Sequence, residues 1–145
     1  MDKEYESLML KNQICFPLYA ASREIIKQYR PHLDAIGLTY TQYITMMVIW
    51  EKEEISVKEL GQILFLDSGT LTPVLKSLEA KGFVRRTRST EDERVLLIRI
   101  TSEGEKLREQ AVSVPAGVAS CVKLEPDEAL KLYELLYKIL NSMKE

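Results

Sequence analysis

The stretch that decides the fold runs from Val57 to Thr101 and reads VKELGQILFLDSGTLTPVLKSLEAKGFVRRTRSTEDERVLLIRIT. Two short segments with helical spacing come first, separated by the turn Phe65-Leu66. Two strand-like runs follow at 84–88 and 95–100, with the charged residues 89–93 as a tip between them. This order is typical of a winged helix-turn-helix, a module that places its second helix in the DNA major groove.

The second of these helices has two candidate starts. Asp67 or Ser68 would place Pro73 inside the helix, whereas capping rules alone favour Thr72 as the cap and Pro73 as the first helical residue. In either case Gly82 ends the helix. Its buried stripe is predicted to consist of Leu71, Val74, Leu75 and Leu78.

The helices that precede this one can be placed from their caps and apolar content. Ser56 with Glu59 forms a capping box that starts the first helix of the pair. Before it, residues 41–52 form a helix with almost no polar face, capped by Thr39 or Thr41. Such a helix belongs in the centre of the fold.

The amino-terminal region is predicted to be one long helix. Residues 8–30 carry a single apolar stripe at helical spacing. Pro17 lies inside this pattern and predicts a kink beside Cys15, and the pair Arg30-Pro31 predicts the end of the helix.

The carboxy-terminal region has more apolar residues than the core of one chain can bury. A helix is predicted at 101–112, Pro115 and Gly117 interrupt it, and a last helix runs from Pro126 to about Met143. Apolar residues cover far more than one face of this last helix, so a second copy of the chain is the expected partner.

Composition limits the class of protein. The chain has 145 residues, 46% of them hydrophobic and 29% charged, which suits one soluble domain. There is no apolar run of membrane-spanning length and no signal-peptide pattern, so we expect a cytoplasmic protein. Two cysteines and one histidine provide neither a disulfide framework nor metal-ligand spacing, so no metal or other cofactor is expected.

Candidate DNA contacts lie on the second helix and on the wing. The net charge of −2 does not indicate a nucleic-acid binder, but five arginines lie between Phe83 and Ile100. An arginine at a hairpin tip can enter a narrow minor groove, and a carboxylate two residues away can orient it. The alternative is a solvated hairpin with compensating charges. The candidates are Asp67, Ser68, Thr70 and Lys76 on the helix, and Arg86, Arg88, Asp92 and Arg94 on the wing.

The segment from Asp67 to Pro73, with Arg86 to Arg88 and Asp92-Glu93-Arg94, resembles the MarR family of bacterial transcription regulators. The resemblance implies a mainly α (α+β) fold in one domain, with the winged helix-turn-helix at 39–101. It implies that the recognition helix begins near Asp67. It also implies that helices in 1–35 and 102–145 form a homodimer that binds an inverted-repeat operator.

The amino-terminal half resembles the organic-hydroperoxide sensors of that family, the OhrR type, through Asn12 to Phe16 and the following tyrosines. The resemblance implies that peroxide oxidises Cys15 and that Tyr29 and Tyr40 of the other subunit hydrogen-bond its sulfur. Hydroxyl donors stabilise a thiolate, the reactive form of cysteine. Tyr19 lies four residues after Cys15 on the same helix face, as a further donor or as a wall of the site.

A sulfenic acid condenses with a thiol, and two different thiols could react with oxidised Cys15. One is Cys121 of the other subunit and the other is a low-molecular-weight thiol. Some members of the resembled family use a carboxy-terminal cysteine in this way.

The leading hypothesis is a repressor whose reduced dimer binds DNA and is released when an organic hydroperoxide oxidises Cys15. One rival keeps the DNA binding but replaces the signal with an aromatic small molecule, or with a broader role in oxidative stress or virulence. Another is a thiol peroxidase with Cys15 as nucleophile. An interaction scaffold would leave the wing arginines unexplained.

Overall fold

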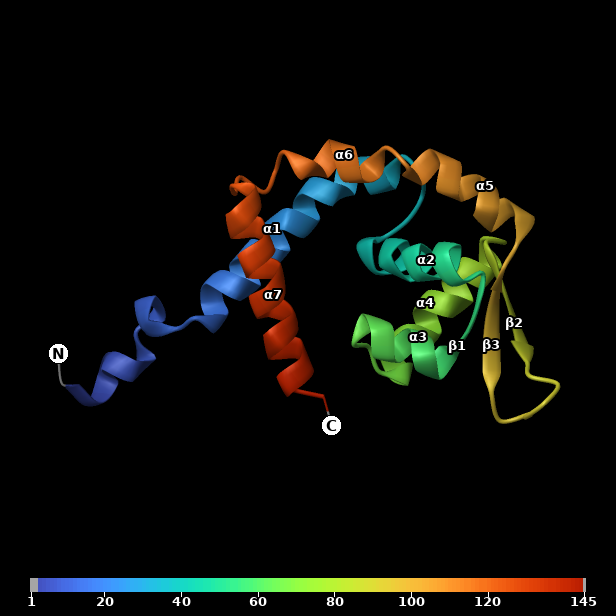
Figure 1. The fold of residues 1–145 in the computed structure, drawn as a ribbon, viewed down its shortest axis with the longest axis horizontal. Helices are drawn as coiled ribbons and strands as arrows, with labels where there is room; N and C mark the ends of the chain where they lie inside the picture. Colours follow the sequence, from blue (N-terminus) through green and yellow to red (C-terminus); the bar gives the residue numbers. More distant parts are fainter. Residues whose placement is uncertain (1–2, 145) are drawn as a thin grey trace.

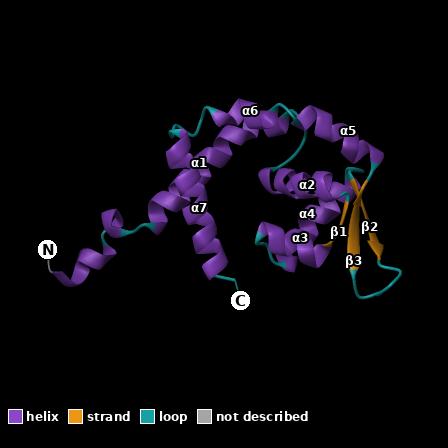
Figure 2. Ribbon diagram, viewed as in Figure 1, coloured by secondary structure: helices purple, strands orange, loops and turns teal. Residues whose placement is uncertain are grey.

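The computed structural model describes residues 3–144 and consists of helices with one small sheet at its edge (Figures 1 and 2). The chain forms an arch, with α1, α6 and α5 along the top and the wing hairpin at one end (Figure 1). The elements are the 3-10 turns η1 (Lys3–Leu8) and η2 (Leu10–Asn12), then α1 (Cys15–Asp34), α2 (Tyr40–Lys52), β1 (Glu54–Ser56), α3 (Val57–Leu64), α4 (Ser68–Ala80), β2 (Val84–Arg88), β3 (Leu96–Ile100), α5 (Ser102–Ala111), α6 (Val114–Ala119) and α7 (Pro126–Ser142).

The two helices of the helix-turn-helix begin at side-chain caps. Ser56 accepts a hydrogen bond from the Glu59 amide at 3.1 Å, which starts α3. Asp67 accepts one from the Thr70 amide at 2.7 Å, so α4 starts at Ser68 and contains Pro73. The start at Asp67 implied by the family resemblance is thus confirmed, and the start at Thr72 favoured by capping rules is wrong.

The wing is a three-stranded antiparallel sheet in the order β1-β3-β2. Ile98 of the central strand β3 is fully buried and pairs with Ile55 on one side and Arg86 on the other. The sequence analysis missed β1 because its three residues are too few for alternation to be recognised, and pairing with a distant strand stabilises it.

The hydrophobic core surrounds α2, as its lack of a polar face predicted. Met46 and Ile49 of this helix have no exposed surface, and Tyr43 is 3% exposed. The helices α3, α4 and α5 and the strand β3 pack around it. Trp50 at its end donates a hydrogen bond from its indole to the Gly104 carbonyl at 2.8 Å, which ties α5 to the core.

The predicted helix at 8–30 differs from the observed α1. The helix begins at Cys15, and Pro17 stands in its first turn. An amide in the first turn has no partner within a helix, so Pro17 costs little there, and the chain departs from helical geometry just before Cys15, at the extended Gln13. The predicted stop at Arg30-Pro31 is also wrong, because the helix continues to Asp34 and buries Leu33 in the core.

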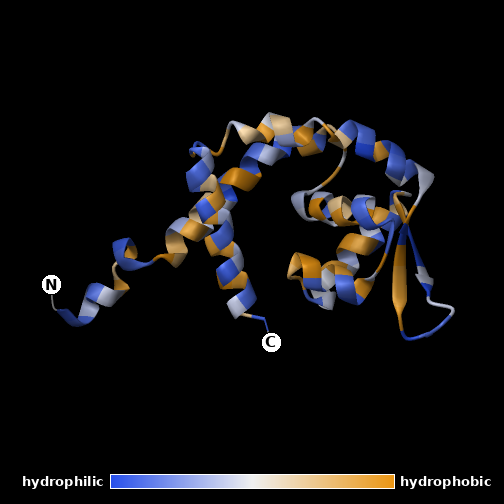
Figure 3. Ribbon diagram, in the orientation of Figure 1, coloured by the Kyte–Doolittle hydropathy of each residue, from blue (hydrophilic) through white to orange (hydrophobic). Residues whose placement is uncertain are grey.

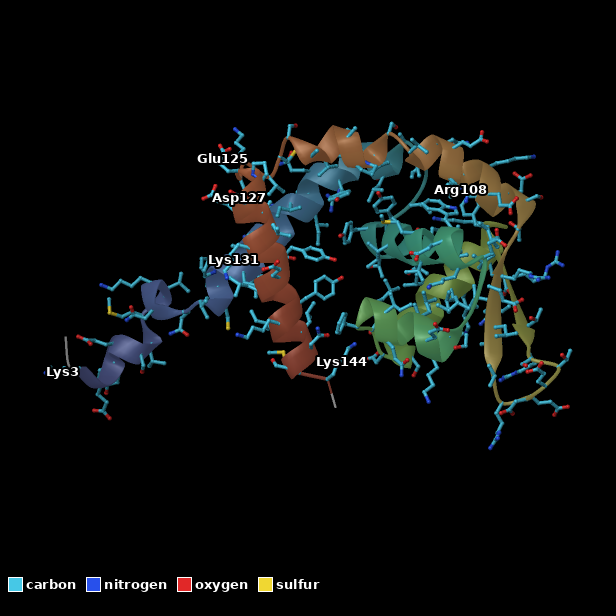
Figure 4. All side chains as sticks on the ribbon, viewed as in Figure 1. Lys3, Arg108, Glu125, Asp127, Lys131 and Lys144 are labelled. Carbon is cyan, nitrogen blue, oxygen red and sulfur yellow. The ribbon has the colours of Figure 1, made fainter. Side chains whose placement is uncertain are left out.

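The two ends of the chain are less buried than the middle. Neither η1, η2 nor α7 contains a buried residue, although apolar residues recur along α7 and the first half of α1 (Figure 3). At its carboxy end α7 approaches the turn before α4: the rings of Tyr137 and Phe65 lie 6.4 Å apart, and the Lys144 ammonium lies 4.9 Å from the Phe65 ring (Figure 4). Among residues 3–144, no helix is both long and apolar enough to cross a membrane.

Candidate functional site

The amino-terminal turn of α4 presents small polar side chains on an exposed surface. Ser68 and Thr70 are exposed, and Lys76 is exposed two turns later. The Asp67 carboxylate is used as the helix cap, and the hydrogen bond from the Thr70 amide lowers its pKa below the ordinary range. Asp67 therefore fixes the start of the helix, while Ser68, Thr70 and Lys76 remain accessible to a partner.

The tip of the wing carries an oriented arginine. The Asp92 carboxylate accepts hydrogen bonds from Arg94 Nε at 3.1 Å and Nη2 at 3.2 Å, and a third from the Arg94 amide. The Arg94 side chain is still 90% exposed, and its side-chain hydrogen bonds, followed by the backbone one, lower the pKa of Asp92. The guanidinium is thus held in one direction in the connection between β2 and β3.

Arg86 and Arg88 are neighbours on the wing but have different surroundings. The Glu79 carboxylate of α4 accepts hydrogen bonds from the Arg86 Nε, Nη2 and backbone amide at 3.0–3.1 Å. These bonds lower the pKa of Glu79, the side-chain bonds contributing most. Arg88 is exposed and makes no ion pair within residues 3–144. Arg86 therefore ties the wing to the recognition helix, while Arg88 remains available to a ligand.

Cys15 and the tyrosines predicted to surround it are far apart within one chain. Cys15 is exposed at the first residue of α1, and Tyr29 lies fourteen residues later on the same helix. At 1.5 Å per residue the separation along the axis is about 21 Å. A single chain therefore cannot bring the Cys15 sulfur to Tyr29.

Tyr29 and Tyr40 lie together, as the sequence analysis required. Their ring centroids are 5.0 Å apart, and Tyr43 completes the cluster at 5.9 and 6.3 Å from them. Burial, and secondarily the nearby Tyr29, raises the pKa of both Tyr40 and Tyr43. These two phenols therefore keep their protons at neutral pH and are suited to donate hydrogen bonds to an anion. Tyr43 was missed, although its place three residues after Tyr40 was a signal.

Tyr19 lies one turn after Cys15 on the same face of α1, as its spacing predicted. Its ring is exposed, and the Arg23 guanidinium lies 5.2 Å from the ring centroid. Tyr19 is therefore the tyrosine of the predicted set that accompanies Cys15 within its own chain.

Cys121 is also remote from Cys15 within the chain. Its Sγ lies 3.7 Å from the Gln28 side-chain oxygen, against the middle of α1. Gln28 is thirteen residues, or about 20 Å of helix, from Cys15. Because a disulfide requires Cα atoms within about 7 Å, the two thiols of one chain cannot be joined in this conformation.

Residues 27–111 match the family model described as transcriptional regulator SarA/Rot. The chain belongs to the SarA/Rot family of transcriptional regulators. A regulator from Bacillus subtilis named organic hydroperoxide resistance transcriptional regulator is 43% identical over 99% of this chain and 97% of its own length. The regulator SarZ of Staphylococcus saprophyticus is 45% identical over 91% of this chain and 90% of its own length. The resemblance to organic-hydroperoxide sensors is thereby confirmed, as is the prediction of a regulator rather than an enzyme.

Solved structures support the same family. Reduced AbfR bound to DNA is 36% identical and matches 98% of this chain and 99% of its own with a TM-score of 0.78. An overoxidised AbfR, also bound to DNA, gives 0.77 at 35% identity. The disulfide form of AbfR, a Staphylococcus epidermidis protein, gives 0.65 at 34% identity over 94% of this chain and 96% of its own. The predicted winged-helix fold is confirmed, and the present conformation resembles the DNA-bound forms more than the disulfide form.

Proposed function

We propose that this regulator is a cytoplasmic homodimeric repressor that binds an inverted-repeat operator while Cys15 is reduced and leaves it when an organic hydroperoxide oxidises Cys15. The observation that carries the proposal is the separation of about 21 Å between Cys15 and Tyr29 within one chain. Because the thiol and the phenol cluster cannot meet within one subunit, a sensing site that contains both must form between two subunits.

The exposed apolar surface at the two ends of the chain supports the dimer. The 17 residues of α7 include none that is buried, yet Leu130 is 59% and Tyr133 61% exposed. In water such a helix gains little from folding alone, because burial of an apolar face supplies most helical stability in proteins. Helices from 1–35 and 102–145 of two chains would cover each other and bring Cys15 of one subunit to Tyr29 and Tyr40 of the other.

In the operator complex the polar side chains of α4 and those of the wing would contact different parts of the DNA. Ser68, Thr70 and Lys76 of α4 would contact phosphates and base edges in the major groove. Arg94, oriented by Asp92, would enter the minor groove, and Arg88 would contact a phosphate. Half-sites of such dimers lie about one helical turn apart, so a change in the spacing of the two α4 helices weakens both contacts together.

The chemistry follows from the thiolate. The Cys15 thiolate attacks the terminal peroxide oxygen, the S–O bond forms as the O–O bond breaks, and the departing alkoxide takes a proton from water and leaves as the alcohol. The sulfur becomes a sulfenic acid and loses the negative charge that the phenols of Tyr29 and Tyr40 were placed to stabilise. Condensation with a thiol then releases water and forms a disulfide, either with Cys121 of the partner subunit or with a low-molecular-weight thiol.

We assign release to the disulfide rather than to further oxidation of the same sulfur. AbfR is found on DNA in both its reduced and its overoxidised form, whereas its disulfide form is the one that departs most from the present conformation. A bond to a second thiol adds bulk and a tether, which can displace helices in a way that a few oxygen atoms on one sulfur do not.

The test is operator affinity with and without cumene hydroperoxide, for the wild type, Cys15→Ser and Cys121→Ser, without added thiol. With Cys121 as the second thiol, we expect the wild type to lose operator on oxidation and to regain it with dithiothreitol, and Cys15→Ser stays bound in every case. If Cys121 is the second thiol, Cys121→Ser also stays bound. If a small thiol is required, neither the wild type nor Cys121→Ser is released until glutathione or cysteine is supplied. Release of Cys15→Ser by the peroxide would refute the proposal.

A further inference from the structure

Gln42, in the first turn of α2, connects three parts of the fold with one buried amide. Its side chain is 7% exposed. Its Oε1 accepts hydrogen bonds from the Thr39 backbone amide at 3.0 Å and from the Lys81 ammonium at 3.0 Å. Its Nε2 donates to the Ser77 hydroxyl at 2.9 Å. The Lys81 ammonium also donates to the Gly37 carbonyl at 2.7 Å.

A second buried polar side chain in the same helix shows what is particular about Gln42. Thr45 has no exposed surface, and its hydroxyl donates to the Thr41 carbonyl within α2 itself. The Gln42 amide instead joins the turn before α2 to the end of α4. A buried amide that loses a partner carries the cost of desolvation, so the parts joined by Gln42 tend to move together or not at all.

The elements that Gln42 joins are the two that the proposed function needs to couple. Thr39 immediately precedes Tyr40, whose ring lies 5.0 Å from that of Tyr29 in the phenol cluster. Ser77 belongs to the last turns of α4, and Lys81 follows its final residue. The side chain of Gln42 therefore links the residue next to Tyr40 to the end of the recognition helix by direct hydrogen bonds.

We propose that Gln42 is a positioning residue that transmits the state of the Tyr29–Tyr40 cluster to α4. The inference rests on the proposed function, because it takes Cys15 oxidation as the event that moves the phenols. A shift of Tyr40 moves the Thr39 amide, which opens the capping box of α2 and loosens the Gln42 amide. Ser77 and Lys81 then lose the partner that holds the end of α4 in its DNA-binding orientation.

The test compares the ratio of operator Kd in the oxidised and reduced states, which measures the coupling between the two sites. Gln42→Leu keeps the size of the side chain but removes the amide. We expect this ratio to fall by about 2- to 30-fold relative to the wild type, the range found for residues that carry coupling. Ser77→Ala removes only the bond to α4 and is expected to lower the ratio in the same direction.

Two variants control for a purely structural role. Thr45→Val removes a buried hydrogen bond from the same helix without breaking a link to α4, and should leave the ratio within about threefold of the wild type. Gln42→Glu keeps an acceptor for Thr39, Lys81 and the Ser77 hydroxyl, and should restore most of the ratio. If Gln42→Leu fails to fold, Ser77→Ala and Gln42→Glu still decide the question.

The outcomes are separable. Gln42→Leu and Ser77→Ala could instead weaken operator binding equally in both redox states. The ratio of oxidised to reduced Kd of each variant would then equal that of the wild type, and the coupling role would be refuted. If the wild type itself shows no difference between its oxidised and reduced states, the proposed function fails, whatever Gln42 does.

Discussion

The middle of this regulator and its two ends differ in how far a single chain buries their side chains. Every buried residue of the described chain lies from Leu33 to Val118, and neither 3–32 nor 119–144 contributes one. The winged helix-turn-helix has its own core, caps and sheet, and its wing is tied to α4 by Glu79 and Arg86. The ends carry the proposed sensing thiol and an uncovered apolar helix.

Under the proposed function, the contrast means that DNA binding and sensing depend on different parts of the dimer. The DNA-reading surface can be formed by one subunit, whereas the proposed sensor requires two. If so, changes in the ends should act on assembly and signal, and changes in the middle should act on folding and groove contacts.

The largest effect is expected from the uncovered helix α7. The double variant Leu130→Glu/Tyr133→Glu places two charges on its apolar surface and should convert the dimer to a monomer. Operator affinity should fall by about 10² to 10⁴-fold, because the second half-site no longer adds to the first. Analytical ultracentrifugation and fluorescence anisotropy measure the two effects.

Lys131→Glu is the matched control for that variant, since it changes the net charge by the same two units on an exposed residue of the same helix. It should remain dimeric. A double variant that stays dimeric at micromolar concentration and binds the operator normally would show that α7 is not part of the interface.

The next largest effect is expected in the core of the middle region. Leu78 has no exposed surface, so Leu78→Ala should lower the free energy of unfolding by about 2–5 kcal/mol. Ile63→Ala, on an exposed part of α3, should cost less than about 1 kcal/mol. Urea denaturation at one fixed protein concentration makes the comparison, and similar losses for the two variants would contradict the assigned core.

The wing tip should show a smaller effect that is confined to DNA. Arg94→Ala is expected to weaken operator binding by about 5- to 150-fold, and Asp92→Asn by less, because the guanidinium remains but loses its guide. The slope of log K against log salt should fall by about one for Arg94→Ala if the contact neutralises a phosphate. If Arg94→Ala bound the operator with unchanged affinity, the wing tip would not be part of the DNA interface.

The smallest effect distinguishes two arginines of β2, Arg86 and Arg88. Arg88→Ala should reduce the salt slope by about one without changing the thermal midpoint, whereas Arg86→Ala should lower the midpoint and leave the slope unchanged. Because the pKa of Glu79 is lowered in the folded state, its ion pair stabilises above the ordinary pKa and is lost as the pH falls through the lowered one. The midpoint difference between Arg86→Ala and wild type should therefore shrink below about pH 4.

The parts of the fold that local chemistry determines could be predicted from the sequence. The side-chain cap of Ser56 predicts the start of α3, and the alternation in β3 predicts a half-buried strand. The start of α4 at Asp67 followed only from the family resemblance, because capping rules alone favoured Thr72. The start of α1 could not be predicted by the same rules, because the apolar stripe continues into residues before Cys15 that form 3-10 turns rather than an α-helix. Nor could the ion pair between Arg86 and Glu79 be predicted, because the turn after α4 brings these two residues together only in the folded chain.

For the proposed sensing site, the sequence and the family resemblance named residues but not their geometry. The sequence indicated Cys15, Tyr29 and Tyr40, and the structure places the two tyrosines together. It could not show that one continuous helix holds the thiol and Tyr29 apart, because that depends on the helix running unbroken from Cys15 past Tyr29. Pro17 suggested a break there, and its position in the first turn removes that objection.

The central claim, that the thiol and the phenols of one sensing site come from different subunits, is tested most directly by mixed dimers. In one mixture, one subunit carries Cys15→Ser and the other carries Tyr29→Phe and Tyr40→Phe. In the second mixture, one subunit carries all three changes and the other is wild type. Each dimer then has one thiol at position 15, and the measurement is the rate at which cumene hydroperoxide oxidises it.

We expect the thiol to react at the wild-type rate in the first mixture, because it meets intact tyrosines across the interface. In the second mixture it meets two phenylalanines and should react at least about tenfold more slowly, since hydrogen bonds to the thiolate are lost. A slow thiol in the first mixture and a fast one in the second would contradict the shared site and place thiol and phenols in the same subunit.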